Sequence, residues 1–202
     1  MPNKLRPLLL TIFLSVCFVG AFFAARAQAE VEVFGKGSVS KNYLASDTST
    51  VSVSVTGGIA MNLLSFLRIE GRYTNISSLQ NKLDINNVGT LSDVMNETNI
   101  YSLGVDVEFG GEKATIAPYV YLGVGYIETT RSYYFTPQGT QSALYLADPK
   151  QDGVSLNAGL GLRLRIVKAL AIELEAYAYA TNIKQASPLI NWYGTAGVRI
   201  FI

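Results

Sequence analysis

The stretch Val51-Ser-Val-Ser-Val-Thr56 has valine at every second position and hydroxyl side chains between the valines. Two later stretches, Leu160-Gly-Leu-Arg-Leu-Arg-Ile166 and Leu170-Ala-Ile-Glu-Leu-Glu-Ala176, keep the same period of two. Successive side chains of a β-strand point to opposite faces, so this alternation predicts strands with one apolar and one polar face. No sustained helical periodicity follows Glu30, and the sequence therefore predicts an all-β fold.

The same alternation predicts eight strands. Their connections are short after the second, fourth and sixth strands, whereas long polar loops are expected at about 76–98, with a candidate helical turn at 91–96, and at about 131–152. Short turns at one end and long loops at the other are typical of a bacterial outer-membrane barrel. We therefore expect an eight-stranded antiparallel up-and-down transmembrane β-barrel. The expected strands are 31–42, 49–62, 66–75, 99–110, 115–130, 153–166, 169–182 and 191–202.

The N-terminus has the composition of a secretory signal peptide. Lys4 and Arg6 precede an apolar run from Leu8 to Ala25, and Ala27-Gln28-Ala29 is a small-x-small cleavage site. This order predicts a cleaved signal peptide over residues 1–29. The alternative is a retained membrane helix, because the apolar run could almost span a bilayer.

The composition excludes several classes of function for the expected barrel domain over residues 30–202. The chain has 202 residues, 16 basic and 15 acidic side chains, one cysteine and no histidine. A net charge of +1 gives no electrostatic reason to expect nucleic acid as a partner. Without histidine, Ser-His-Asp catalysis is impossible, and paired carboxylates such as Glu173 and Glu175 are better explained as ion pairs. We expect no enzyme activity, no cofactor and no metal.

Alternation alone does not decide whether the apolar face contacts lipid or fills a soluble lipocalin-type barrel. Aromatic residues near the long-loop end favour lipid, because they predict a membrane-interface girdle: Tyr73, Tyr101, Tyr126 and Trp192. Small residues on the polar face fit a narrow interior. These are Gly58, Gly104, Gly123, Gly125, Gly159, Gly161 and Gly197. The sequence thus favours the membrane barrel, and the soluble ligand-binding barrel remains an alternative.

Two motifs resemble the small eight-stranded outer-membrane barrels, the group of the OmpA transmembrane domain, OmpX and the opacity proteins. Ala117-Pro-Tyr-Val-Tyr-Leu-Gly-Val-Gly-Tyr126 is similar to a strand common in that group. The terminal stretch from Thr195 to Ile202 is similar to the group's assembly signal, carried here by Thr195, Gly197, Ile200 and Ile202, although Phe201 is penultimate where the group usually ends in an aromatic residue.

The resemblance covers the chain after the signal peptide and implies location in the bacterial outer membrane, with both mature termini facing the periplasm. The implied partners are outer-membrane lipid, lipopolysaccharide and the outer-membrane assembly machinery. Fold alone does not give an activity, because this fold carries adhesins, channels, structural anchors and enzymes.

Outward apolar faces leave twelve charged side chains pointing into the lumen. Six are basic and six acidic, and oppositely charged residues lie on neighbouring strands, which predicts ion pairs. Because eight strands leave little room beyond their side chains, we expect a packed plug; the alternative is an ion-selective or gated pore. The twelve residues are Glu32, Lys36, Arg68, Glu70, Arg72, Asp106, Glu108, Arg163, Arg165, Glu173, Glu175 and Arg199.

The second long loop has a high apolar density for a surface segment, in Tyr133, Tyr134, Phe135, Leu144 and Tyr145. These side chains either pack together and extend the girdle, or form a contact surface for an extracellular protein, a cell or lipopolysaccharide. The favoured function is a structural or adhesin-like surface protein with a closed lumen. The alternative is a small channel for small or hydrophobic solutes, like the OmpW group.

Overall fold

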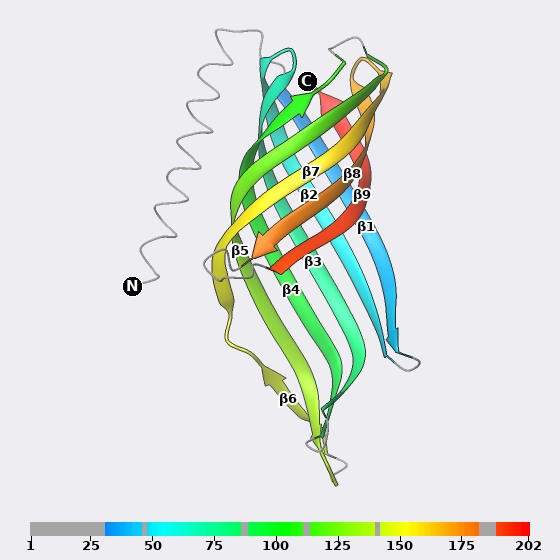
Figure 1. Cartoon of the computed structure of the whole chain (residues 1–202), viewed down its shortest axis with the longest axis vertical. Helices are drawn as coiled ribbons and strands as arrows, with labels where there is room; N and C mark the ends of the chain where they lie inside the picture. The colour runs from blue at the N-terminus through cyan, green and yellow to red at the C-terminus, as the bar shows by residue number, and fades with distance from the viewer. Residues whose placement is uncertain (1–30, 46–47, 86–88, 111–113, 140–141, 182–188) are drawn as a thin grey trace, which may run out of the picture.

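The structure, a computed structural model, describes residues 31–45, 48–85, 89–110, 114–139, 142–181 and 189–202 (Figure 1). The expected signal peptide over 1–29 lies outside these residues. The described chain is almost entirely strand: β1 Val31–Ala45, β2 Thr48–Leu64, β3 Leu67–Ile85, β4 Gly89–Glu108, β5 Ile116–Pro137, β6 Leu144–Ala147, β7 Gln151–Val167, β8 Leu170–Thr181 and β9 Leu189–Phe201.

Eight of these strands close into an antiparallel barrel, which confirms the predicted fold. Consecutive strands pair along the chain, with β5 pairing directly with β7, and β1 pairs with β9 to complete the circuit. The remaining strand, β6, is short and pairs only with the end of β5, where Tyr134 is the register partner of Tyr145. Because Glu32 pairs with Phe201, β1 begins and β9 ends at the short-turn end of the barrel.

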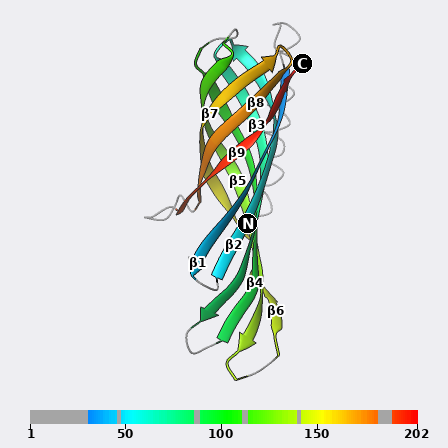
Figure 2. The same ribbon diagram turned by 90° about the vertical axis from the view of Figure 1, so that its right-hand side faces the viewer.

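The predictions of two long irregular loops were wrong. Residues 76–98 are the outer halves of β3 and β4, which pair as far as Ile85 and Gly89, so the expected helical turn at 91–96 is strand as well. Much of 131–152 is also strand, as the end of β5 and all of β6. These hairpins extend well beyond the ends of β8 and β9 (Figures 1 and 2).

The reason for this error is physical. Period-two alternation reports that the two faces of a strand have different surroundings, and it fades where water covers both faces. All four residues of β6 are exposed, and the outer face of β3 beyond Tyr73 begins with Asn75 and Ser77. Backbone pairing continues in these segments although the alternation that identifies a strand has ended.

The two faces of the wall are chemically distinct over most of its height. Outward valine, leucine and isoleucine side chains are exposed, such as Val55, Leu122 and Leu160, which are 58%, 62% and 64% exposed. The inward face carries the buried charges and hydroxyls. Among the described residues, no helix is both long and apolar enough to span a membrane.

Candidate functional site: the lumen and the extended hairpins

All twelve predicted lumen charges lie on the inner face of the barrel. Eleven are buried, and the side chain of Arg165 is 15% exposed. Every one of them takes part in at least one ion pair, and the pairs connect all twelve into one continuous network. Burying a charge without a partner is costly, so this balance of six cations and six anions is what allows the lumen to be filled with charge.

The part of the network near the short turns is centred on Arg68 and Arg163. Arg68 contacts Glu32 at 2.8 Å, Asp106 at 3.2 Å and Glu108 at 3.0 Å. Arg163 contacts Asp106 of β4 at 3.2 Å and Glu173 of β8 at 2.7 Å, and it also pairs with Glu108. Each guanidinium therefore joins carboxylates from different strands and ties the wall together across the interior.

Arg165 reaches the same group of carboxylates from the edge of the network, where its guanidinium contacts Glu108 at 2.6 Å. Its register partner on β8 is Ala171, so the residue directly across this strand pair is not acidic. Arg165 thus pairs with β4, whereas the sequence predicted an acidic partner on the adjacent β8.

A second part of the network is joined by Arg199 and Lys36. Arg199 contacts Glu32 at 2.7 Å, Glu70 at 3.0 Å and Glu173 at 2.6 Å. Lys36 contacts Glu173 at 2.9 Å and pairs with Glu175 as well. The Arg199 contacts with Glu32 and Glu173 join paired strands, whereas the Arg199–Glu70 contact joins β9 to β3, which do not pair, and so bridges the lumen.

Arg72 ends the network at the side facing the extended hairpins. Its guanidinium pairs with Glu70 on the same strand and contacts Glu175 of β8 at 2.6 Å across the lumen. The guanidinium carbon also lies 3.5 Å from the ring centroid of Tyr121, a cation–π arrangement. Arg72 therefore links the charged layer to an aromatic layer on the side of the extended hairpins.

Three inward aromatic residues were missed in the sequence because they lie on the polar face of their strands. The Tyr119 hydroxyl donates to Glu175 at 2.7 Å and accepts a hydrogen bond from Lys36 at 3.1 Å. Phe34 lies against the Arg199 guanidinium, 4.5 Å from ring centroid to guanidinium carbon. The sequence did contain one sign of their inward position. Period-two alternation places Phe34, Tyr119 and Tyr121 on the same face of the sheet as the charged residues.

The inward glycines make room for these rings. A Cβ on Gly104 would lie 2.6 Å from the Tyr121 ring, and one on Gly123 would overlap the hydroxyl of the same tyrosine. Tyr121 thus lies flat across two glycine positions on β4 and β5. The polar-face glycines are a packing requirement of the filled lumen.

A buried cluster, largely of tyrosines, lies in the interior between the charges and the extended hairpins. Ile100, Tyr121, Ile127, Tyr177 and Tyr179 form one buried cluster with Ile76 and Tyr193 packed against it. The Tyr177 and Tyr193 ring centroids are 5.4 Å apart, and the Tyr177 hydroxyl donates to Asn157 at 3.0 Å. The lumen therefore holds an ionic layer near the short turns and an aromatic layer toward the extended hairpins.

The predicted girdle aromatics lie on the outer face. Tyr73 and Tyr101 are 43% and 50% exposed, with ring centroids 5.2 Å apart, and Tyr126 is their neighbour on β5. The Tyr73 hydroxyl donates to Asn99 at 2.7 Å. Trp192 lies apart from these three on β9 and is 79% exposed.

The five aromatic and leucine residues expected in a loop lie instead on paired strands. Tyr133, Tyr134 and Phe135 belong to β5, and Leu144 and Tyr145 belong to β6. Tyr134 and Tyr145 form an edge-to-face pair with ring centroids 5.4 Å apart. We define the tip patch as Tyr134, Leu144, Tyr145 and Leu146, which are 43%, 55%, 62% and 41% exposed.

The residues of the predicted assembly signal occupy β9 and the chain end. Thr195 is buried on the inner face, whereas Ile200 and Ile202 are exposed outward. A Cβ on Gly197 would overlap the carbonyl oxygen of Gly35 on the neighbouring β1. Gly197 thus permits the close approach of the two strands that complete the barrel.

Comparison with known proteins places the fold among small outer-membrane barrels. OprG of Pseudomonas aeruginosa is 10% identical with a TM-score of 0.54, over 86% of this chain and 95% of that one. The N-terminal barrel of P. aeruginosa OprF is 18% identical with a TM-score of 0.46, over 86% and 96%. Neisserial surface protein A is 13% identical with a TM-score of 0.47, over 86% and 97%.

No protein-family model and no curated protein sequence matches the chain. The similarity to OprG, with a TM-score of 0.54 at 10% identity, establishes the fold alone. The predicted resemblance to the small eight-stranded outer-membrane barrels is confirmed at that level.

Proposed function

We propose that the chain is an integral outer-membrane barrel that acts as a structural or adhesin-like surface protein through its extended hairpins. The band of exposed valine, leucine and isoleucine on the barrel wall supports a lipid surrounding. In this arrangement the short turns and both mature termini face the periplasm, and the extended hairpins of β3, β4, β5 and β6 face the outside.

The packing of the lumen supports a closed barrel. Its charges are balanced and paired, and the aromatic layer lies directly above them. The alternative of a small OmpW-like channel needs a continuous path for solute, and this path would have to cross both layers. We therefore place the function on the outer surface of the protein.

The tip patch is the observation that carries this proposal, because polar residues separate it from the lipid-facing wall. Along the outer face of β5, Tyr126 is followed by Glu128, Thr130 and Ser132 before Tyr134. Glu128 pairs with Lys150 at 2.6 Å. Tyr134 lies about 26 Å along the strand from Tyr126, at the usual rise per residue. The tip patch is therefore too distant to be a continuation of the girdle.

Exposed aromatic and leucine side chains on a water-facing hairpin are typical of a protein contact surface. The Tyr134–Tyr145 pair places two rings together on one face of the hairpin. Leu144 and Leu146 alternate with Tyr145 along β6 and therefore lie on the opposite face of the same hairpin. This chemistry fits an extracellular protein or a cell-surface ligand with apolar groups of its own.

The first prediction concerns attachment. Bacteria that display the wild-type protein should adhere to epithelial monolayers and laminin-coated surfaces more than cells carrying an empty vector. The double variant Tyr134→Ser/Tyr145→Ser should lose most of this gain, roughly 10-fold if the two aromatic residues act as binding hot spots. Adhesion is counted as bound cells per field, and surface display is measured on the same cultures.

The matched control is Tyr134→Phe/Tyr145→Phe, which keeps both rings and should retain adhesion. Insertion is checked for each variant by the heat-dependent shift of the folded barrel on gels. No gain of adhesion with the wild-type protein, or unchanged adhesion in the serine variant, contradicts the proposed surface role.

A further inference from the structure

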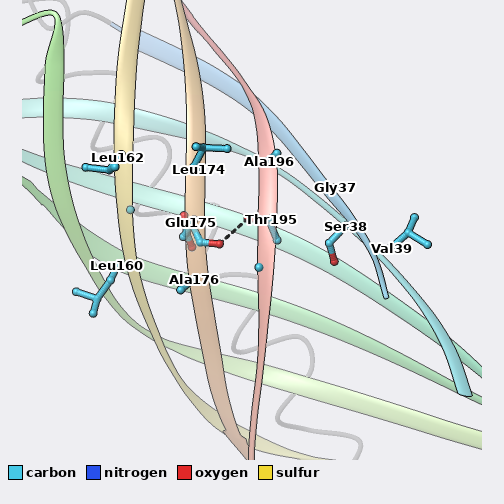
Figure 3. A pocket seen from close by; sticks show the side chains of 12 residues that line it. Gly37, Ser38, Val39, Leu160, Leu162, Leu174, Glu175, Ala176, Thr195 and Ala196 are labelled. Atoms are coloured by element: carbon cyan, nitrogen blue, oxygen red, sulfur yellow. Dashed lines mark hydrogen bonds between the residues drawn. The ribbon is translucent and has the colours of Figure 1, made fainter. Parts of the chain in front are cut away.

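The barrel wall is split between its first and last strands. β1 pairs with β9 only from Glu32 to Gly37, opposite Phe201 to Ala196. Beyond Gly37, β1 continues to pair with β2 as far as Ala45, and β9 pairs with β8 from Leu189 onward. The two strands diverge beyond their paired part, toward the bottom of Figures 1 and 3. Within the described residues, each therefore leaves one edge without a strand partner.

A groove of about 710 Å³ lies beside this split and crosses β7, β8, β9 and β1 (Figure 3). Leucines on the outer face form its walls: Leu160, Leu162 and Leu174. Small residues on β8 and β9 keep it open, namely Ala176, Gly194 and Ala196, and a Cβ on Gly194 would meet no atom within 4 Å. The groove therefore has mainly apolar walls on the outside of the barrel, and Ser38, Glu175 and Thr195 also line it.

The surroundings of the split are apolar on both sides. Val39 on the β1 side is 75% exposed, and Ile190 and Trp192 on the β9 side are 68% and 79% exposed. These outward side chains continue the lipid-facing band of the wall. Whatever occupies the groove therefore reaches it from a hydrocarbon medium.

The split itself offers hydrogen-bonding groups. Alternate residues of each free edge turn their backbone N–H and C=O groups toward the gap, and such groups are unfavourable in hydrocarbon unless they find a partner. Hydroxyls lie on the same borders: the Ser38 hydroxyl is 2.8 Å from that of Ser54, and Thr195 donates to the Glu175 carbonyl at 3.5 Å. A purely apolar occupant would leave the strand edges unsatisfied.

We propose that the split and its groove bind one amphiphile of the surrounding membrane, an acyl-chain phospholipid. Its acyl chain lies in the groove between Leu160, Leu162 and Leu174, and its polar head hydrogen-bonds with the free edges of β1 and β9. The site holds a lipid rather than passing it inward, because the Lys36–Glu175 pair and Tyr193, packed on Tyr177, fill the lumen behind the split. This inference rests on the proposed outer-membrane location.

The experiment measures lipid retained by the refolded protein. The protein is inserted into phosphatidylethanolamine vesicles, extracted in mild detergent, washed, and weighed by native mass spectrometry. Wild-type protein should retain one phosphatidylethanolamine. Gly194→Leu, which fills the groove where a Cβ has free space, should lower the retained fraction at least tenfold.

The matched control is Gly35→Leu, because Gly35 also faces outward and a Cβ there would meet no atom within 4 Å, but it lies in the paired part of β1. It should retain lipid as the wild-type protein does. No lipid on the wild-type protein, or equal retention by both leucine variants, overturns the site. A dimer mass that Gly194→Leu abolishes overturns it in favour of a second copy pairing with the free edges.

Insertion is tested first, by heat-dependent gel migration from the same vesicles. Failure of the wild-type protein to insert contradicts the proposed outer-membrane function and the lipid site with it. Insertion without retained lipid overturns the lipid site alone.

Discussion

Arg199 illustrates how single residues hold this interior together. Its guanidinium contacts carboxylates from three other strands, Glu32, Glu70 and Glu173, and its carbon lies over the Phe34 ring. A lysine would supply charge but not the planar fork that reaches several carboxylates at once. The ion-pair network of the lumen therefore depends on the shape of the arginine side chain as much as on its charge.

The second prediction follows from these contacts. Arg199→Met leaves the lumen with one uncompensated negative charge and should lower the free energy of unfolding by about 3–5 kcal/mol, the usual cost of removing one partner of a buried pair. Unfolding in urea from vesicles can be followed by the fluorescence of Trp192, the single tryptophan.

The control for Arg199 is Lys150→Met, which removes an exposed pair with Glu128; the Lys150 side chain is 43% exposed. Loss of this pair should cost less than about 1 kcal/mol because solvent already screens it. Equal effects of the two substitutions would contradict a stabilising role for the buried network.

At the level of elements, the extended hairpin of β3 and β4 is the largest departure from the sequence-based expectation. The strands remain paired through Leu79–Met95 and Leu83–Leu91, although polar residues such as Asn75 and Glu97 occupy their outer faces. Asn75 donates to Glu97 at 3.2 Å and to Asn99 at 2.9 Å. Cross-strand polar contacts thus replace lipid-facing packing above the barrel.

The third prediction tests this hairpin by amide hydrogen exchange. The amides of Leu79, Gln80, Val94 and Met95 should exchange at least on the order of 100-fold more slowly than in an unstructured chain, because backbone pairing protects them. The exposed turn at Gln138 and Gly139 provides the fast-exchanging comparison within the same protein. Exchange of the four amides at the rate of that turn would show that 76–98 behaves as a loop.

At the level of the whole molecule, one barrel combines three environments. The outer wall is apolar, and β6 at the tip of the extended hairpins is exposed throughout. The interior is ionic near the short turns and aromatic toward the extended hairpins. The paired charges of the interior hold the wall together, and the tip patch is the surface on which we propose that a partner binds. The split between β1 and β9 is the place where the wall is incomplete.

The fourth prediction concerns conductance of the whole barrel. Refolded protein in a planar bilayer should give no stable, sizeable single-channel currents, because paired side chains fill an eight-stranded interior. A porin with a wide aqueous channel in the same bilayer serves as the positive control. Stable currents from the wild-type protein would refute the closed lumen and favour the channel alternative.

The pattern of residues along the chain is enough to predict the strand-rich fold, the number of strands in the barrel and the division into outward apolar and inward charged faces. Period-two patterning reports burial directly, and this is why Val53 and Arg163 could be assigned to opposite faces from the amino-acid order alone. The two in-register pairs Arg68–Asp106 and Arg163–Glu173 were also accessible, since they lie on neighbouring strands.

Which strands meet across the lumen, and where pairing stops, depends instead on the closed tertiary structure. The Arg72–Glu175 and Arg199–Glu70 contacts require barrel closure, which joins residues about a hundred or more positions apart. The same closure left β1 and β9 partly unpaired, because their paired segment ends at Gly37 while each strand continues with its other neighbour. Alternation encodes the faces of a strand, but register and closure are properties of the whole sheet.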